Sequence, residues 1–586
     1  MLDRVLPPPD AREHSHPEPL GAQRERGKWH LAALIAILLL ATAVRFHDIA
    51  RHPLWLDEFL ALLHSAGQGE AFFSGHHGVR TGGGEGSLAT SGVRTPPPDL
   101  VGRLERAPYP QIWRGMLRDV HPPLYQILLR VWRDAMNPLF GDGDALVRAL
   151  GALLGVAGVA MLWDVVRLLH GPAPALWAAL IMALAAPQIQ WAQDARPYTL
   201  LILLALGAID GVVRLERLGP GIRRAVALGA CTLGAALTHY YALPALLAMG
   251  CYAAIRLRGR NRLQAGAALL GAVVLFLVMW GPTFVSQVRG GEAHSGYLVD
   301  SAPGHLGRTL VRLAVLPARS LNEPAPRVVA VACLGAILFV LPLLLRRRRP
   351  DLALWGWWMA GAVAPALTID LLKQWEQLEL LRYTSLATPA FYAMIAAVGV
   401  GGTLASRRTW LRHVLPAVAA LSCIVSLPHA YEERQNPQPD YLWLAFNFTS
   451  HARSGDVLVF HHAHDRGSLL LWYMAMSWYM PAEKMPETVV FLMDEPSAAE
   501  AEVLRKSTNV WTVSEPGGTL PPAVSAGRVP GHSASGFNLP VLQQWVRPTT
   551  PLVFETYSPA FAVGRPPVSG DRAAEREIGD GRVISR

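Results

Sequence analysis

The sequence predicts a mainly α-helical protein: a polytopic membrane helical bundle of about eleven spans, followed by a small α/β extracytoplasmic domain. Of the 586 residues, 51% are apolar and 17% are charged, whereas soluble domains carry about 25% charged residues. The mean hydropathy is +0.25. Long apolar runs recur from residue 29 to residue 430 and then stop. Together these observations indicate an integral membrane protein with a separate C-terminal domain.

The expected spans follow from the length of helix that crosses a bilayer, which is about 20 residues. They are 29–48, 145–169, 174–191, 197–213, 225–241, 242–256, 264–284, 328–345, 352–371, 384–405 and 411–428. Residues 1–28 are polar and rich in proline, so we expect a disordered cytoplasmic N-terminus. Ala41-Thr-Ala43 resembles a signal-peptidase site. We expect no cleavage there, because the preceding segment is long and mixed in charge and many spans follow.

The net charge of +9 is distributed along the chain and does not form one basic patch, so nucleic acid is not an expected partner. Lys and Arg cluster at the ends of apolar runs, where they set membrane topology. The clusters lie at 24–28, 214–224, 256–262, 346–349 and 407–412. With eleven spans, all of them fall on the N-terminal side, which is therefore expected to be cytoplasmic. The high Ala, Arg and Gly content fits a bacterial inner (plasma) membrane, with the C-terminal domain in the periplasm.

The transmembrane domain is expected over 29–430, and its outer loop, 49–144, is not uniform. Residues 66–99 are rich in Gly, Ser and Thr, which predicts a flexible insert. Apolar residues recur at helical spacing over 109–136, which predicts short amphipathic helices on the outer membrane surface.

After the last span, residues 431–565 alternate short apolar runs with helical segments, which predicts a periplasmic α/β domain. Residues 566–586 are polar and predict a disordered tail. The cysteines Cys231, Cys251, Cys333 and Cys423 lie in or beside apolar runs without metal-ligand spacing. They are expected to be small core residues.

Asp57 and Glu58 directly follow the first predicted span. A charge at bilayer depth costs about 2.5–3.5 kcal/mol on insertion scales, so adjacent carboxylates this close to a membrane must be hydrated, paired or metal-bound. They are either solvated acids at a helix end or a catalytic carboxylate at the water–lipid boundary. The remaining polar clusters bear on this choice.

Further polar clusters fall on the same predicted outer face. They are Asp119-Val-His121-Pro-Pro-Leu-Tyr125, Gln193-Asp194-Ala-Arg196-Pro-Tyr198, Thr238-His239-Tyr240-Tyr241, and Arg382-Tyr383 with Lys373, Glu376 and Glu379 before them. Taken alone, a histidine more often caps or packs, and an arginine more often extends to the interface. Their coincidence on one face, beside a carboxylate pair, favours an active site.

These motifs, in this order, resemble those of the C-type membrane glycosyltransferases over about residues 29–430. The closest groups are glycosyltransferase family 39 and its bacterial relatives. These include protein O-mannosyltransferase-like enzymes, the lipid A aminoarabinose transferase and the rhizobial core-sugar transferase-like proteins. The resemblance implies a hexosyl or pentosyl transferase that moves a sugar from a polyprenyl-phosphate donor to an acceptor hydroxyl outside the cytoplasm. A single displacement would invert the anomeric centre.

The resemblance also implies roles for individual residues. Asp57 would be the general base that takes the acceptor proton, and Glu58 would position the acceptor or a metal. Arg382, assisted by Lys373, would stabilise the leaving phosphate. The residues expected to line the donor phosphate or sugar are His121, Asp194, Arg196, Tyr198 and Tyr383.

Cofactor and partner expectations are less specific. No cofactor is required by the sequence, and a divalent metal stays open, with Asp57, Glu58 and His239 as candidate ligands. His461-His-Ala-His464-Asp465 is read as a polar loop near the acceptor rather than a metal site. The expected partners are the polyprenyl-phosphate donor, membrane lipids, and an acceptor that is a glycan, a lipid or a protein.

The main alternative is a membrane transporter or a flippase for lipid-linked sugars. Transporters usually contain internal repeats and charged residues near the bilayer middle. This sequence has no clear repeat, and its ionisable residues gather at the outer ends of the spans. A polymerase or ligase for lipid-linked glycans would differ mainly in its acceptor. A non-catalytic scaffold would not need these clusters on one face.

Overall fold

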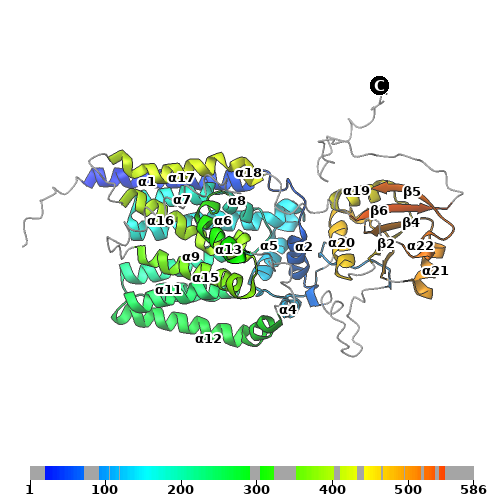
Figure 1. Ribbon diagram of the computed structural model, residues 1–586, viewed down its shortest axis with the longest axis horizontal. Coiled ribbons are helices and arrows are strands. Elements are labelled where there is room, and N and C mark those ends of the chain that lie inside the picture. Colours follow the sequence, from blue (N-terminus) through cyan, green and yellow to red (C-terminus); the bar gives the residue numbers. More distant parts are fainter. Residues whose placement is uncertain are drawn as a thin grey trace, which may run out of the picture. The chain divides into compact units, whose positions relative to one another are not determined.

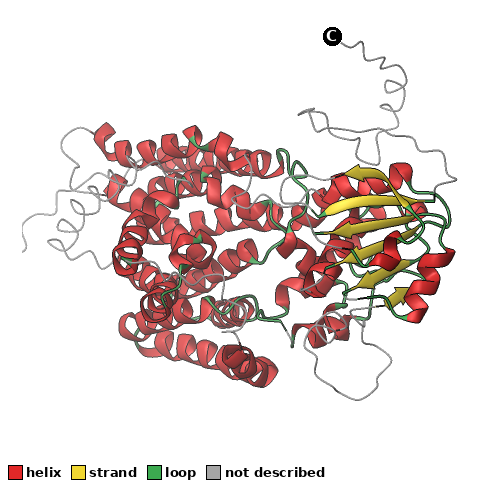
Figure 2. Ribbon diagram, turned by 45° about the vertical axis from the view of Figure 1, so that its right-hand side comes forward, coloured by secondary structure: helices red, strands yellow, loops and turns green. Residues whose placement is uncertain are grey.

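A computed structural model describes residues 20–70, 92–103, 106–117, 119–290, 304–322, 352–401, 409–431, 441–462, 466–493, 495–515, 520–534 and 540–547. The chain divides into two compact units. Unit 1 comprises Met1–Ala89 and Asp99–Gln438, and unit 2 comprises Thr90–Pro98 and Pro439–Arg586. Unit 1 is built from helices, whereas unit 2 contains a sheet (Figures 1 and 2).

Figure 1 shows the helices of unit 1. The first group is α1 (Leu20–Phe46), α2 (Leu56–Ser65), α4 (Tyr109–Met116), α5 (Leu124–Phe140), α6 (Asp144–His170), α7 (Pro172–Leu184), α8 (Ala186–Ala192), α9 (Tyr198–Leu218), α10 (Ile222–Ala236), α11 (Ala242–Arg256) and α12 (Gly259–Gly290). The second group is α13 (His305–Arg319), α15 (Ala353–Lys373), η4 (Gln377–Glu379), η5 (Leu381–Ala387), α16 (Thr388–Gly401), η6 (Thr409–His413), α17 (Val414–Val425) and α18 (Leu427–Tyr431).

Several of these helices are suited to cross a membrane. By length and composition, five described segments qualify: Lys28–Phe46, Asp144–His170, Tyr198–Leu218, Gly259–Arg289 and Leu381–Val400. A sixth is added if α7 and α8, bent by 61°, form one span. The expected span 328–345 lies outside the described residues. The mainly α-helical membrane fold is therefore confirmed, and the count of about eleven spans stays a prediction.

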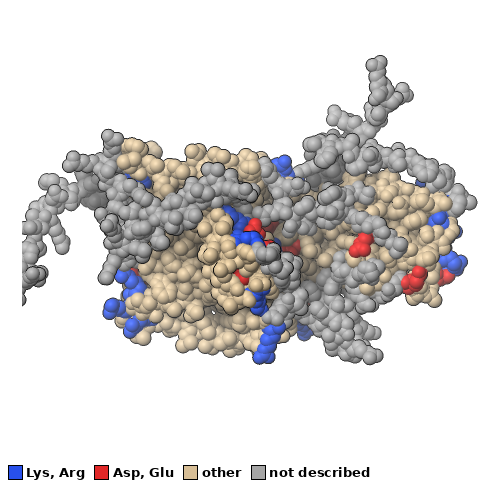
Figure 3. All heavy atoms as spheres, in the orientation of Figure 1, with Lys and Arg blue, Asp and Glu red and all other residues tan. Residues whose placement is uncertain are grey.

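The surface of unit 1 is apolar where a membrane would surround it. On α12, Val273, Leu275 and Val278 are 50%, 51% and 75% exposed. The described surface of the helical unit shows few charged side chains in the view of Figure 3. Contiguous exposed apolar surface is costly in water, so these side chains are expected to face lipid. The protein is a multi-pass membrane protein.

The arginine-rich ends of three helices of unit 1 lie together. Arg214 of α9 pairs with Asp164 of α6, and its Nε lies 2.6 Å from Asp210. Arg256, the last residue of α11, has its Nε 2.7 Å from Glu216 of α9. The C-terminal ends of α6, α9 and α11 therefore meet at one end of the bundle.

The opposite end of the bundle brings the end of α8 and the loop before α9 beside α6. A Cβ at Gly151 of α6 would lie 2.8 Å from the Ala192 carbonyl oxygen and 3.0 Å from that of Asp194. Only glycine allows this approach without a shift of the backbone. The loop between α8 and α9, which carries Asp194 and Arg196, is thus seated on α6.

Unit 2 contains one six-stranded sheet in the order β1-β3-β2-β4-β6-β5. Its strands are β1 (Gly92–Arg94), β2 (Val457–His461), β3 (Val489–Leu492), β4 (Val510–Ser514), β5 (Val529–Ala534) and β6 (Val541–Val546). Its helices are α19 (Tyr441–His451), α20 (Arg466–Tyr479), η7 (Ala482–Lys484), α21 (Ala498–Lys506) and α22 (Pro522–Ser525). β2 runs parallel to β3 and β4, and the other pairs are antiparallel. A small α/β unit at the C-terminus is confirmed.

Both faces of this sheet are covered. Val459 and Val510 pack with Leu504 of α21 and Val524 of α22 on one face. On the other face, Tyr473 of α20 contacts Phe460 and Phe491, and Phe448 of α19 contacts Trp511. Burial on both faces explains why β2, β3 and β4 are mostly apolar and show no alternation between apolar and polar residues.

The segment expected to be a flexible insert, 66–99, is not uniform in the structure. Residues 92–94 form β1, which pairs with β3 in the sheet of unit 2. Residues 71–91 lie outside the described residues, as do 1–19 and the tail after 547. Unit 2 begins at Pro439, eight residues after the predicted boundary at 431, and it also takes Thr90–Pro98 from the predicted insert.

Candidate functional site

Asp57, in the first turn of α2, lies between two guanidinium groups. Its Oδ2 is 3.4 Å from Arg196 Nη2 and 3.7 Å from Arg382 Nη1. Arg196 Nη1 also donates a hydrogen bond to the Asp57 carbonyl oxygen at 3.2 Å. The Asp57 side chain is 23% exposed. Segments far apart in sequence thus place two cations beside a carboxylate that solvent still reaches.

Glu58, the next residue, has a different environment. Its side chain is fully buried, and Arg148 of α6 donates to both of its oxygens, from Nε at 2.8 Å and from Nη2 at 2.7 Å. The backbone N–H groups of Ala195 and Trp55 donate to it at 2.9 and 3.1 Å. Glu58 therefore ties the start of α2 to α6 and to the loop before α9.

Arg148 also holds the connection between α1 and α2. It donates to the carbonyl oxygens of Ile49, His52 and Pro53 at 3.1, 2.7 and 3.1 Å. A bidentate arginine–carboxylate pair fixes geometry as well as charge. The Glu58–Arg148 pair thus sets the position from which Asp57 projects.

Histidines and a further carboxylate continue the polar cluster. Asp119 Oδ2 lies 3.6 Å from His64 Nε2 and 3.4 Å from His121 Nδ1. The His121 ring is 5.2 Å from that of His239, which follows α10. The motifs at 119–125 and 238–241 therefore meet in space.

Burial and neighbouring charges set the protonation states of the residues in this polar cluster. Burial opposes ionisation of Asp119, but His64 and His121 outweigh it and hold the pKa of Asp119 below its usual range. Burial lowers the pKa of His239, and His121, Arg196 and Arg382 lower it further. Burial opposes the charge of Arg196, but Asp57 raises its pKa. At neutral pH the site holds an anionic Asp119, a neutral His239 and a charged Arg196.

Two aromatic rings lie near Arg382. Its guanidinium carbon lies 5.3 Å from the Tyr383 ring centroid and 5.8 Å from that of Trp55. Tyr383 stacks on Tyr241 at 5.4 Å, and the Tyr241 hydroxyl donates to Gln377. Such cation–π contacts stabilise a planar guanidinium at a defined position.

Most of the predicted site residues therefore come together. Asp57, His121, Arg196, Tyr198, Arg382 and Tyr383 belong to one cluster with His239, whose ring is 6.4 Å from that of Tyr198. Asp194 lies beside it, in the loop whose Ala195 N–H binds Glu58. Lys373 lies instead at the exposed end of α15, with its ammonium group 5.3 Å from the Trp375 ring centroid.

Sequence reasoning missed Arg148 and His64. Both lie within predominantly apolar stretches, where a charged or polar residue signals a buried partner, and that signal was present in the sequence.

A divalent metal does not fit the residues described. Across the described parts of the chain, no three or more His, Cys, Asp and Glu side chains are arranged to hold a metal ion. Of the candidate ligands, Glu58 is engaged by Arg148. His464 and Asp465 lie outside the described residues. We derive no step through a metal.

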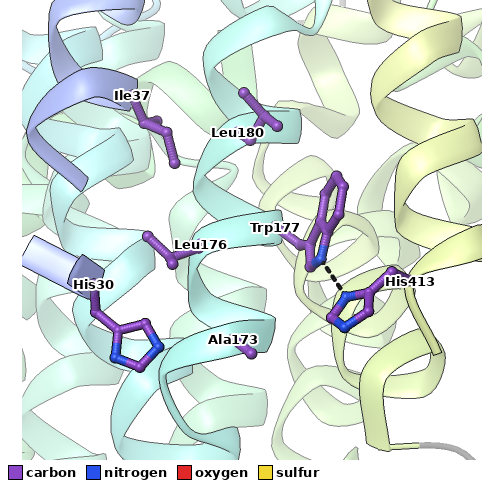
Figure 4. Close-up of a pocket in the computed structure, with 7 residues that line it drawn as sticks. All are labelled: His30, Ile37, Ala173, Leu176, Trp177, Leu180 and His413. Atoms are coloured by element: carbon purple, nitrogen blue, oxygen red, sulfur yellow. Dashed lines mark hydrogen bonds between the residues drawn. The ribbon is translucent and has the colours of Figure 1, made fainter. Parts of the chain in front are cut away.

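An apolar cavity of about 330 Å³ lies elsewhere in unit 1. Figure 4 shows its lining, with Trp177 Nε1 donating to His413 Nδ1 at 3.0 Å and His30 on the neighbouring helix. His30 is near the start of α1, whereas Asp57 follows the end of that helix, so the two sites lie toward opposite ends of α1. None of the described residues that line the cavity is a carboxylate.

The comparisons with known proteins agree with this architecture. Residues 120–285 match the family model described as dolichyl-phosphate-mannose-protein mannosyltransferase. This range holds His121, Arg148, Asp194, Arg196 and His239. No curated protein matches the chain by sequence.

Solved structures match the chain, some of them over most of its length. ArnT from Cupriavidus metallidurans bound to undecaprenyl phosphate is 16% identical, with a TM-score of 0.51, over 87% of this chain and 97% of that one. Its apo form gives 16% identity and a TM-score of 0.51 over 89% and 98%. The Saccharomyces cerevisiae protein O-mannosyltransferase Pmt1–Pmt2 complex bound to the sugar donor gives 16% identity and a TM-score of 0.31. That match covers 44% of this chain and spans only 34% of the yeast chain.

The chain has the fold of the C-type membrane glycosyltransferases, which confirms the predicted resemblance. Residues 120–285 match the protein mannosyltransferase family model, which agrees with the predicted relation to glycosyltransferase family 39.

Proposed function

We propose that this protein transfers a sugar from a polyprenyl-phosphate donor to an acceptor hydroxyl at the periplasmic face of a bacterial inner membrane. The observation that carries the proposal is the solvent-reachable Asp57 carboxylate between Arg196 and Arg382. The cluster lies at the end of the bundle opposite the arginine-rich helix ends, and those ends are expected to be cytoplasmic. The solved relative bound to undecaprenyl phosphate supports a donor lipid of this class.

In the proposed reaction, the acceptor oxygen attacks the anomeric carbon while the bond from that carbon to the phosphate oxygen breaks. Asp57 takes the proton of the acceptor hydroxyl, and the released phosphate carries the displaced electron pair. General base catalysis typically contributes about 10²–10⁴-fold. One displacement inverts the anomeric centre.

The two arginines have a second role in this proposal. Their distances to Asp57 Oδ2, 3.4 and 3.7 Å, are longer than a hydrogen bond. A phosphate binds a planar guanidinium in bidentate geometry, which is stronger than such loose pairing. Donor binding would therefore draw Arg382 toward the phosphate and leave the Asp57 carboxylate available as the base.

The remaining predicted residues take supporting roles. We propose that Glu58 is a positioning residue rather than an acceptor or metal ligand, because Arg148 and two backbone N–H groups occupy its oxygens. His121, Tyr198 and Tyr383 line the donor sugar or phosphate. Lys373 is not needed at the reacting atoms.

The test is a transfer assay on purified protein with labelled polyprenyl-phosphate sugars of the hexose and pentose series. Asp57→Asn is expected to lower transfer at least about 10²-fold and to leave thermal unfolding unchanged. Asp48→Asn is the matched control, because Asp48 is a nearby carboxylate, in the connection between α1 and α2, and is paired with Arg51 at 3.5 Å. Equal transfer by wild type and Asp57→Asn would refute the base assignment. Movement of donor lipid across vesicles without sugar transfer would indicate a flippase instead.

A further inference from the structure

The carboxyl ends of the parallel strands of unit 2 gather polar side chains that the proposed reaction does not use. β2 lies between β3 and β4 and is parallel to both. The helix after β2, α20, covers one face of the sheet, and the helix after β3, α21, covers the other. The chain therefore changes direction at β2. In open parallel sheets, ligands bind outside the carboxyl ends of the strands at such a point.

A polar pair joins the two strand ends at this point. His461, the last residue of β2, is in register with Ser514, the last residue of β4. His462 follows β2, and its Nε2 lies 2.5 Å from Glu515 Oε1, which follows β4. The side chain of His462 is 10% exposed, whereas that of Glu515 is 40% exposed. The pair thus extends from the sheet edge to solvent.

An aromatic ring lies beside the pair. The Trp472 ring of α20 is 5.3 Å from the His462 ring, with an angle of 41° between their planes. Carboxylate and imidazole groups exchange hydrogen bonds with hydroxyls, and an indole face packs against apolar C–H surface. This combination suits a ligand that carries both hydroxyls and C–H faces.

Charge and sequence narrow the class of ligand. The exposed Glu515 carboxylate repels an anionic group at this edge. The sequence after β2, His462-Ala-His-Asp-Arg466, lacks the glycine fingerprint that dinucleotide-binding sheets use. A neutral saccharide fits both observations better than a nucleotide or a free phosphate.

We propose that unit 2 binds a neutral saccharide at the carboxyl end of β2 and β4, through His462, Glu515 and Trp472. We assign this saccharide to the acceptor, and that assignment rests on the proposed function. Unit 2 is then the part of the chain that selects a glycan acceptor, while the Asp57 cluster of unit 1 carries the transfer chemistry.

The direct test uses the full chain in lipid nanodiscs, free of glycoside detergents, and no donor. Saturation-transfer NMR is recorded with methyl glycosides of glucose, galactose and mannose. At least one is expected to receive saturation, and Glu515→Gln is expected to weaken its binding about tenfold, the loss of one charge-assisted hydrogen bond. Trp472→Leu should act in the same direction. Glu502→Gln is the matched control, because Glu502 is an exposed carboxylate of α21 paired with Arg505.

Three outcomes would overturn the saccharide site: no saturation of any glycoside, equal binding by Glu515→Gln, or displacement of the glycoside by inorganic phosphate. A second measurement addresses the acceptor assignment. In the transfer assay, Glu515→Gln should raise the acceptor KM with kcat unchanged, and an unchanged KM would reject that assignment. Because glycoside binding is measured without donor, its result does not depend on the role of Asp57.

Discussion

The two ends of α2 hold their charged neighbours in different ways. At the C-terminal end, Arg133 Nη1 donates to Ser65 Oγ at 3.1 Å, and Arg130 Nη1 donates to the Ser65 carbonyl oxygen at 3.3 Å. Arg133 is fully buried, and its Nη2 lies 2.6 Å from Asp142. Arg106 adds bonds of 2.6 Å to Asp142 and to Asp134. This end is a closed network of short bonds.

At the N-terminal end, two adjacent residues differ: Glu58 is held by short bonds, whereas Asp57 is held more loosely. Glu58 is bound by Arg148 at 2.7 and 2.8 Å, whereas Asp57 meets its arginines at 3.4 and 3.7 Å. Short, buried pairs hold the helix, whereas the longer pairs beside Asp57 are looser than a bidentate contact between a guanidinium and a phosphate. The difference suggests that α2 is fixed along most of its length so that Asp57 has a defined position.

The largest expected effect on stability comes from breaking the buried Glu58–Arg148 pair. Arg148→Ala leaves Glu58 buried without its cation, and loss of one partner of a buried pair costs about 3–5 kcal/mol. We expect a clear fall in the thermal unfolding temperature in detergent, together with loss of transfer. Arg148→Met combined with Glu58→Gln removes both charges and should recover much of the stability. If Arg148→Ala unfolds at the wild-type temperature, the Glu58–Arg148 pair does not hold α2.

The next effect is expected at Arg382, beside Asp57. Removing a cation that faces developing negative charge typically costs about 10²–10³-fold in kcat, so Arg382→Gln is expected to lose transfer by this factor. Its unfolding temperature should change less than that of Arg148→Ala, because the Arg382–Asp57 pair is long, at 3.7 Å, whereas the Arg148–Glu58 pair is short and fully buried. Arg258→Gln, at an exposed position between α11 and α12, is the control. If Arg382→Gln loses stability and activity together, Arg382 has a structural role like that of Arg148.

A pH profile separates the histidines of the cluster from its carboxylates. Burial lowers the pKa of His239 and of His64, so the unfolded chain takes protons below about pH 6.5 that the folded chain does not. Stability should therefore fall as the pH drops from 7 toward 5, by at most about 1.4 kcal/mol per pH unit for each histidine. Asp119, whose pKa is held low by His64 and His121, contributes stability that is present above about pH 4 and lost only below it.

The measurement is the thermal unfolding temperature from pH 8 to pH 4 for wild type and His239→Gln. The groups that face His239 are His121, Arg196, Arg382 and Asp119. The variant is expected to lose part of the decline between pH 7 and pH 5 while keeping the decline below pH 4. Identical profiles would mean that His239 binds its proton equally in both states.

Much of this arrangement follows from the sequence, because alternating spans send every second connection to the same side of a membrane. That rule brings Asp57, His121, Arg196, His239 and Arg382 to one end although the set spans more than 300 residues of sequence. It does not distinguish Asp57 from Glu58. Neighbouring residues on a helix point about 100° apart, so their environments depend on how α2 is rotated against α6, which no local pattern specifies.

Other elements were beyond prediction for similar reasons. β1 is three residues long and lies in a glycine-rich stretch, so it shows no strand periodicity, and only its pairing with β3 defines it. The expected span 174–191 is bent by 61° between α7 and α8, and Pro187 is the second residue of α8. A proline favours a helix start, but it does not fix the angle between two helices.

The smallest expected effect is that of removing a charge far from the site. It tests whether a charged pair elsewhere in unit 1 also affects stability and transfer. Arg256 and Glu216 form a short pair, 2.7 Å, at the opposite end of the bundle, but the Arg256 side chain is 45% exposed. Exposed pairs contribute about 0–1 kcal/mol, because water and salt screen them and side-chain order costs entropy. Arg256→Gln should therefore lower stability by no more than this and leave transfer unchanged, in contrast to Arg148→Ala and Arg382→Gln. A large loss of transfer would show that the chemistry depends on charges at both ends of the bundle, as a transport mechanism would require.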